Sequence, residues 1–339
     1  MTARRWAWVA FLVLVACGAL APLLCNDLPL VARTADGFRF PAFVALRGMP
    51  LPPPDGATWK EWWAALPDGG PQWAWMPPWP WSPNEVTPNV LAAPDLRHPL
   101  GTDDTGRDVL ARLVHGAGTT LLVALGAVGL ALLIGVPLGA IAGYCAFTWI
   151  DTLVLRVVEV FLCFPALFLA LSAVALLGGS PLTLILVLGV VNWTHFTRVV
   201  RGEFLSLRER EFVLAARNLG VSSARIVCRH MLPQVKGAIL VVAAFGAAGA
   251  MIVESGLSFL GLGAGLHLPS WGSMLAQGKE HAHAGAWHLW LFPTLALATA
   301  VLSLHVLADA RPAPPYKRCS SLATSGGASA PLPSGSSGG

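Results

Sequence analysis

The chain has 339 residues, of which 55% are hydrophobic and only 12% are charged. An ordinary soluble domain carries roughly 25% charged residues, so this composition excludes a soluble globular protein and predicts an integral membrane protein. The formal net charge of +4 is small, and it does not indicate a nucleic-acid partner. The 6 cysteines lack CxxC spacing and predict neither a disulfide framework nor a metal site.

Six segments are apolar over the roughly 20 residues that a helix needs to cross a bilayer. The predicted spans are Trp6–Leu24, Thr119–Tyr144, Thr152–Leu177, Leu182–Val200, Ala238–Leu260 and Trp287–Leu307. Gly178 to Pro181 predict a turn between the third and fourth spans, and Pro137 and Pro165 predict kinks. The predicted fold is all-α, a polytopic membrane protein with six transmembrane helices and a large extracytoplasmic loop between spans one and two.

The distribution of basic residues sets the predicted orientation, because short cytoplasmic loops carry an excess of Lys and Arg. Arg4 and Arg5 place the N-terminus in the cytoplasm, and six crossings bring residues 201–236 and the C-terminus to the same side. The basic residues in and beside that loop agree with this topology: Arg198, Arg201, Arg208, Arg210, Arg217, Arg225, Arg229 and Lys236.

The chain therefore divides into four predicted parts. Residues 1–25 form an N-terminal transmembrane helix, 26–117 an extracytoplasmic segment, and 118–308 a five-span core with the cytoplasmic loop 201–236. Residues 309–339 are rich in Pro, Ser, Gly and Ala, which predicts a disordered tail. The first span has an alternative interpretation as a lipoprotein signal ending at Cys17 or a signal cleaved at Ala19–Ala21; either would leave the remaining topology unchanged.

The cytoplasmic loop has the local signals of two short helices. Ser206 and Glu209 form a capping-box pattern that predicts a helix start at Leu207, and Gly220 predicts its left-handed end. Ser222 predicts the N-cap of a second helix, and Pro233 predicts its end.

Small side chains give the first of these helices a face on which another protein could pack closely. Ala215 and Ala216 form this low-relief face, with Phe212 and Leu219 near its edges. The alternative is that the arginines of the loop serve only topology and lipid headgroups. Topology alone requires neither two capped helices nor a glycine between them.

The order of residues in the loop resembles the EAA loop of the membrane subunits of bacterial ABC importers. Leu214 departs from that pattern, since the family usually has a glutamate there. The resemblance implies that the loop forms a coupling helix seated in a groove of a separate ATPase subunit. The residues that carry this role are Glu211, Ala215, Ala216, Arg217, Leu219, Gly220 and Pro233, the last within His230-Met231-Leu232-Pro233.

Further segments resemble the oligopeptide and dipeptide branch of the same family. They are "HPLGTDDTGRDVLARLVHGA" at 98–117, "ESGLSFLGLG" at 254–263 and "PSWGSMLAQG" at 269–278, and the resemblance covers 95–308 almost continuously. "NDLPLVARTADGFRFPAF" from Asn26 and "WMPPWPWSPNEV" from Trp75 resemble the subgroup that includes the microcin C importer.

This resemblance implies a type I permease fold in the bacterial inner membrane and a cargo of peptides or peptide-like compounds. It implies a heterodimer with a second, related permease, ABC ATPase subunits that bind ATP and Mg, and an extracytoplasmic substrate-binding protein. Membrane lipid is the remaining partner, and no nucleic acid is expected. Two other classes remain open: a secondary transporter or channel, and a membrane-anchored sensor or assembly factor.

The chain encodes no nucleotide motor of its own. A P-loop reads G-x-x-x-x-G-K-[ST], and the nearest approach, Gly272 to Lys279, has a longer glycine spacing and is followed by Glu280. No Ser-His-Asp arrangement is indicated, so we expect no catalysis and no cofactor in this chain. Four histidines lack the companions of a metal site, so none is predicted: His267, His281, His283 and His288.

Within the spans, the default role of unusual residues is packing. Gly135, Gly139 and Gly143 recur on one face of the second span, a spacing that lets helices approach closely. Arg156 and Glu159 stand three apart, and we expect them to pair rather than to gate. Glu254 has no partner visible in the sequence, and a place on the translocation path is one hypothesis for it.

The extracytoplasmic segment is rich in tryptophan. Thr58 and Glu61 form a capping-box pattern, and Trp59, Trp62, Trp63 and Leu66 follow on one helical face. Such a helix is expected to lie flat in the headgroup region, as an aromatic membrane anchor or as a docking platform for the binding protein.

Overall fold

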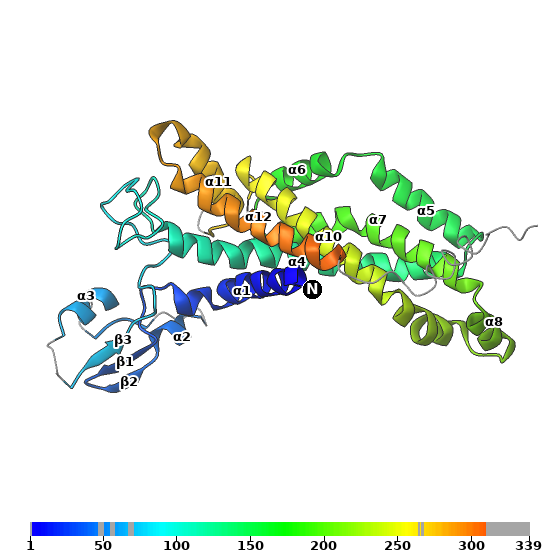
Figure 1. The fold of residues 1–339 in the computed structure, drawn as a ribbon, viewed down its shortest axis with the longest axis horizontal. Coiled ribbons are helices and arrows are strands. Elements are labelled where there is room, and N and C mark those ends of the chain that lie inside the picture. The colour runs from blue at the N-terminus through cyan, green and yellow to red at the C-terminus, as the bar shows by residue number, and fades with distance from the viewer. Residues whose placement is uncertain are drawn as a thin grey trace, which may run out of the picture.

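The computed structural model describes residues 2–46, 51–54, 58–66, 71–263, 265 and 268–309. The protein is elongated, with most helices running along its long axis, a small sheet at one end and α8 at the other (Figure 1). Among the described residues, 5 helices are long and apolar enough to cross a membrane, or up to 6 if a bent helix pair is one span. His267 and the predicted disorder of residues 310–339 lie outside the described residues.

Five of the predicted spans are confirmed as long helices. They are α1 (Thr2–Leu24), α4 (Val109–Tyr144), α7 (Pro181–Arg208), α10 (Leu232–Phe259) and α12 (His288–Asp309). α4 begins ahead of the predicted Thr119, because Asp108 caps it by accepting a 2.7 Å hydrogen bond from the backbone N–H of Ala111. α4 continues through Pro137 as a single helix.

The kink predicted at Pro165 is confirmed, and the third span is a bent helix pair rather than one continuous helix. The segment forms α5 (Trp149–Leu162) and α6 (Ala166–Leu177), which meet at an angle of 76°. Pro165, which lacks a backbone N–H and disfavours helical geometry in the residue before it, occupies the N-cap of α6. The predicted turn after α6 is confirmed, since Gly178 has a φ of +83° and the Ser180 hydroxyl accepts from the N–H of Thr183 at 3.1 Å.

α4 and α7 approach each other through the predicted glycine face. A Cβ added to Gly135 would lie 2.6 Å from the carbonyl oxygen of Trp193, and one added to Gly139 would lie 2.6 Å from that of Thr197. At Gly143 the same atom would lie 2.5 Å from Cβ of Phe204. Only glycine therefore permits this spacing along the length of the helix pair.

A three-stranded antiparallel sheet, at the end of the molecule opposite α8, corrects the all-α prediction to a mostly helical fold. Its strands are β1 (Val31–Thr34), β2 (Gly37–Arg39) and β3 (Trp73–Trp75), in the order β2-β1-β3. Ala32 of β1 pairs with Arg39 of β2 and with Ala74 of β3. Two short helices, α2 (Pro41–Ala45) and α3 (Trp59–Ala64), accompany the sheet (Figure 1).

The tryptophan-rich helix forms as predicted but does not present its whole aromatic face. The capping box is confirmed: the Thr58 hydroxyl accepts from Glu61 N–H at 3.2 Å, and Thr58 N–H donates to the Glu61 carboxylate at 2.9 Å. Trp59 and Trp62, however, are buried against the sheet around Ala32. The expectation that this face lies in lipid headgroups is therefore wrong for these two rings, because the small domain needs them as its core.

The glycine face of α4 generates a stability prediction. We expect Gly139→Ala to destabilise the protein by about 1–3 kcal/mol, because the added methyl group overlaps the backbone of α7. The matched control is Gly129→Ala on the same helix, where an added Cβ meets nothing within 4 Å. The control should gain about 0.5–1 kcal/mol from reduced backbone entropy of the unfolded chain. Thermal unfolding of the detergent-solubilised protein measures both; an equal melting temperature for the two variants would contradict the close approach.

Candidate functional site

Residues 201–236, predicted to form a cytoplasmic loop with two short helices, contain one separate short helix. α7 continues to Arg208, so Ser206 lies inside it and its hydroxyl donates to the Glu203 carbonyl at 2.9 Å; the predicted helix start at Leu207 is wrong. The short helix is α8 (Glu211–Asn218). Its predicted end is confirmed, because Gly220 has a φ of +73° and Val221 N–H donates to the carbonyl of Ala216 at 3.1 Å.

The second predicted helix merges with the fifth span. α9 (Ser223–Arg225) begins after Ser222, as expected, but continues through a π-helical segment, Ile226–Met231, into α10. The predicted end before Pro233 is therefore wrong. The widened turn ahead of Pro233 explains why, because it makes room for a ring that would clash with the preceding turn of an α-helix.

The predicted alanine face of α8 does not form, because its two alanines lie on different sides of the helix, one buried and one exposed. Val213 and Ala216 are buried against a cluster that includes Phe204 and Ile226, so Ala216 belongs to the interior. The exposed face instead carries Phe212, Leu214, Ala215 and Leu219, and Leu219 is 82% exposed. α8 thus presents an apolar face at the end of the molecule opposite the sheet (Figure 1).

Polar contacts hold α8 to the ends of its neighbours. The Arg217 guanidinium lies over the ring of Tyr144, the last residue of α4, at 4.6 Å from the centroid. The Tyr144 hydroxyl donates to Ser223 Oγ at 3.1 Å. These contacts tie the exposed face of α8 to the long helix that crosses the whole protein.

The start of α5 is fixed to α7 by a bidentate ion pair. Arg201 Nε and Nη2 lie 2.6 and 2.8 Å from the Asp151 carboxylate oxygens, and the carboxylate also accepts from Phe147 N–H at 3.0 Å. Arg208 donates to the carbonyl of Ala146 at 2.9 Å. The loop between α4 and α5 is therefore tied to the C-terminal end of α7.

Glu254 is fully buried and has hydroxyl partners that the sequence did not reveal. Ser258 donates to its carboxylate at 2.8 Å and Ser255 at 3.4 Å. Ser270 in turn donates to Ser258 Oγ at 3.4 Å. The role of Glu254 in translocation stays a prediction, and its carboxylate lies within helix packing.

The three sequence motifs of the resemblance meet around α11 (Trp271–Glu280). The fully buried Trp271 donates from its indole to the carbonyl of Leu113 at 3.0 Å, and a Cβ added to Gly116 would lie 3.2 Å from its ring. A Cβ added to Gly272 would lie 2.5 Å from Cα of Ser255. Segments 98–117, 254–263 and 269–278 thus form one packing unit near the start of α4.

A buried ion network at the head of α4 belongs to the same unit. The Asp103 carboxylate lies 2.8 Å from Arg107 Nε and 3.5 Å from Arg112 Nε. Arg112 also donates to the side chain of Gln277 in α11 at 3.1 Å. Burial alone would raise the pKa of Asp103, but Arg112, Arg107 and the hydrogen bond from Thr105 lower it overall.

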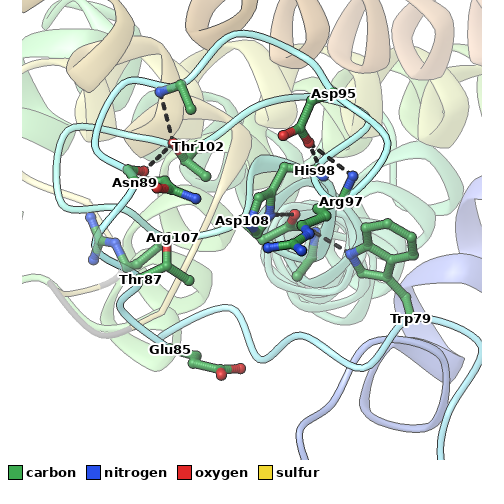
Figure 2. Close-up of polar contacts among 12 residues, drawn as sticks. Trp79, Glu85, Thr87, Asn89, Asp95, Arg97, His98, Thr102, Arg107 and Asp108 are labelled. Carbon is green, nitrogen blue, oxygen red and sulfur yellow. Dashed lines mark hydrogen bonds and ion pairs between the residues drawn. The ribbon is translucent and has the colours of Figure 1, made fainter.

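The Asp108 carboxylate connects the segment before α4, at Trp79 and His98, to the start of that helix, as Figure 2 shows. It lies 2.8 Å from His98 Nδ1 and accepts from the Trp79 indole at 3.0 Å, besides capping the helix. His98 and Asp108 are both buried. The segment 98–117 was recognised as a motif in the sequence, but its acidic and basic residues were assigned no role. The signal that could have identified them was the high density of charged residues beside an uncharged span.

The structure also places the remaining polar residues singled out in the sequence, the Arg156–Glu159 pair and the histidines. Arg156 and Glu159 pair as expected, with 2.8 Å between Nη1 and Oε2, and both are exposed. His288 is buried and bonds to the Thr102 carbonyl at 3.0 Å, whereas His283 is exposed. Within the described ranges, no three His, Cys, Asp or Glu side chains form a metal-binding group.

Comparison with known proteins defines the class of protein. The family model described as binding-protein-dependent transport system inner membrane component matches residues 135–310. The chain belongs to this family, and it is a multi-pass membrane permease component of an ABC importer without catalytic activity of its own.

Individual relatives fall within the same family. The chain is 39% identical to the dipeptide transport system permease protein DppC of Alkalihalophilus pseudofirmus, over 65% of this chain and 72% of the relative. It is 36% identical to a putative peptide permease protein of Brucella suis, over 68% of this chain and 76% of the relative. A chain of the MetNI methionine ABC transporter in an inward-facing form aligns with a TM-score of 0.49 and 18% identity, over 58% of this chain and 93% of that one.

The buried network generates a second prediction. Asp103→Asn should cost about 3–5 kcal/mol, because it leaves the Arg112 guanidinium buried without its counter-charge. The control is Asp36→Asn, whose side chain is 74% exposed beside Arg39; its cost should be about 0–1 kcal/mol. Since folding lowers the pKa of Asp103, its contribution is present above the unfolded pKa of about 3.9 and is lost as the pH falls further. Thermal unfolding across this pH range measures the effect, and a pH-independent difference between wild type and Asp103→Asn would contradict it.

Proposed function

We propose that this chain is the permease subunit of an ATP-driven importer for peptides or peptide-like compounds. The observation that carries the proposal is α8, a short helix with an exposed apolar face attached to the end of α4, in a chain of the binding-protein-dependent family. The names of the relatives, a dipeptide permease and a peptide permease, support peptides as the cargo. At a finer level, the proposal places the chain in the subgroup that includes the microcin C importer.

In this proposal, the energy comes from a separate ATPase subunit. The exposed apolar residues of α8 seat in a groove of that subunit, which binds ATP and Mg. Because Arg217 and Tyr144 join α8 to α4, closure of the ATPase carries the ends of the spans with it. The proposed EAA-type coupling loop also includes six further residues: Glu211, Ala215, Ala216, Leu219, Gly220 and Pro233.

The remaining partners follow from the same proposal. A second, related permease completes the translocation path with this type I chain, and an extracytoplasmic binding protein delivers cargo to the outer end. Both termini then lie in the cytoplasm, on the side of α8, and residues 26–117 lie outside. A place for Glu254 on the path belongs to the proposal too, although its burial favours a role in packing.

A cross-linking experiment tests the proposed orientation and partner. With the native cysteines replaced, Leu219→Cys at the exposed end of α8 should cross-link to the copurified ATPase subunit. Trp63→Cys, at the 45% exposed ring beside the sheet, is the control and should not. Labelling by a membrane-impermeant thiol reagent in intact cells should show the reverse pattern. Transport by the chain alone, without ATP or a copurifying ATPase, would overturn the proposal in favour of a secondary transporter.

The glycine after α8 provides a test of coupling. An added Cβ at Gly220 meets nothing within 4 Å, but its φ of +73° is left-handed. Gly220→Val should therefore strain the backbone by about 1–2 kcal/mol and shift α8. ATP hydrolysis by the assembled complex should continue while peptide uptake falls. Gly220→Asn is the matched control, because asparagine tolerates this conformation, and it should retain uptake. Equal uptake in both variants would show that the angle of α8 does not matter for coupling.

A further inference from the structure

A cavity of about 560 Å³ lies between α7 and α10. Its walls include His195, Phe196 and Arg198 on α7, and Phe245 and Gly249 on α10. These residues lie near the middle of both helices, Pro181–Arg208 and Leu232–Phe259. The cavity is thus far from both the outer network and α8, and its volume falls in the range of about 300–1,000 Å³ that small-molecule sites occupy.

The polar side of this cavity has a basic character. Arg198 and His195 are exposed, and neither forms an ion pair within the described part of the chain. Asn192 adds an amide whose nitrogen donates to the carbonyl of Leu188 at 2.8 Å, which leaves its oxygen and second N–H free for other contacts. No aspartate or glutamate lines the cavity.

The neighbouring arginines of the same helix have partners. Arg201 forms the ion pair with Asp151, and Arg208 donates to the Ala146 carbonyl. Arg198 lies in the last turn of the predicted span Leu182–Val200, and it has no counter-charge among the described residues. A guanidinium at this depth needs water or an anion, so the unpaired arginine indicates a wet or anion-filled space.

We propose that this cavity is a subsite of the translocation path that attracts the carboxylate of the cargo through Arg198 and His195. The proposal rests on the function proposed above and adds the chemical group that the path recognises. A planar guanidinium matches a carboxylate with two parallel hydrogen bonds, and the amide of Asn192 supplies a further polar contact. Phe245, which is 38% exposed, offers apolar surface to the remainder of a peptide.

Glycines keep the α10 wall open. A Cβ added to Gly249 would meet nothing within 4 Å, so a larger side chain there enters the cavity without displacing the backbone. Gly249→Leu therefore fills the site, and Gly249→Cys places a thiol in it. Gly129 on α4 is equally open and lies outside the cavity lining, which makes Gly129→Leu and Gly129→Cys the matched controls.

Thiol labelling tests the electrostatic character of the cavity without knowledge of the natural peptide. The assembled transporter, with native cysteines replaced and Gly249→Cys introduced, is treated with an anionic (sulfonatoethyl) or a cationic (trimethylammonioethyl) methanethiosulfonate. The anionic reagent should react faster by about tenfold, and Arg198→Gln should abolish the difference. An introduced thiol that is unreactive in both the nucleotide-free and the ATP-trapped complex, or a rate ratio indifferent to Arg198→Gln, would overturn the proposal.

A phospholipid phosphate shares the chemistry of a carboxylate, and bilayer composition separates the two sources. Labelling of the Gly249→Cys variant is repeated in nanodiscs of phosphatidylcholine alone and with phosphatidylglycerol added. A translocation subsite should label equally in both. Protection confined to the phosphatidylglycerol discs would assign the cavity to lipid, and burial of the introduced thiol only when the second permease is present would assign it to a subunit contact; either result overturns the proposal.

Uptake of alanyl-alanine by the complete transporter in liposomes links the subsite to transport. Gly249→Leu and Arg198→Gln should lower uptake by about tenfold with ATPase copurification unchanged, whereas Gly129→Leu and Arg156→Gln should match wild type. If the wild-type complex transports no peptide yet labels as expected, the proposed cargo fails and the anion-attracting cavity stands. If alanyl-alanine uptake is normal in both cavity variants, the subsite fails and the importer stands.

Discussion

The close approach of α4 and α7 sets the orientation of everything else in the membrane core. Because Gly135, Gly139 and Gly143 admit the backbone of α7, one face of that helix is committed to α4 along its length. The Thr197 hydroxyl donates to the Gly135 carbonyl at 3.2 Å and fixes the rotation of α7 within this contact. The opposite face, with its polar residues, must then turn away from α4 toward α10 and the cavity. The glycine face of α4 therefore determines the direction in which α7 presents its polar and charged residues.

The two ends of the protein use different interactions, and this difference bears on coupling. At the end with the sheet, buried charges such as Asp103 and Arg112, together with Trp271, form one packing unit. At the opposite end, α8 is held by a cation–π contact and by a small apolar cluster around Val213. In the proposed function, force applied to α8 would pass to α4 through Tyr144 and along that long helix.

The sequence predicted the spans well because hydropathy and caps are local signals. Asp108, Ser180 and Gly220 end or begin helices through contacts within a few residues, although only Gly220 was recognised as a helix end and Ser180 only as part of a turn. The bend at Pro165 was predicted, whereas the continuity at Pro233 depended on three-dimensional context, since a proline can end a helix or sit in its first turn. The burial of Trp59 and Trp62 required a sheet whose third strand lies far in the sequence from the first two. Ser255 and Ser258, which donate to Glu254, lie within one helical turn of it and were a local signal that was missed. Ser270, which donates to Ser258, comes from the start of another helix.

The position of the charges favours movement of whole subunits over deformation of this chain. If this chain opened the translocation path by bending, Asp103 would separate from Arg112 and both charges would stay desolvated. The free-energy cost of this separation would exceed the stabilisation that any single contact of α8 supplies. The ion pair of Asp151 with Arg201 makes a second connection, between the start of α5 and α7. Such a chain can tilt against a partner while its interior stays intact. A cavity on the α7–α10 face would then change its access to either side of the membrane without changing its lining, which is the requirement that alternating access places on a binding surface.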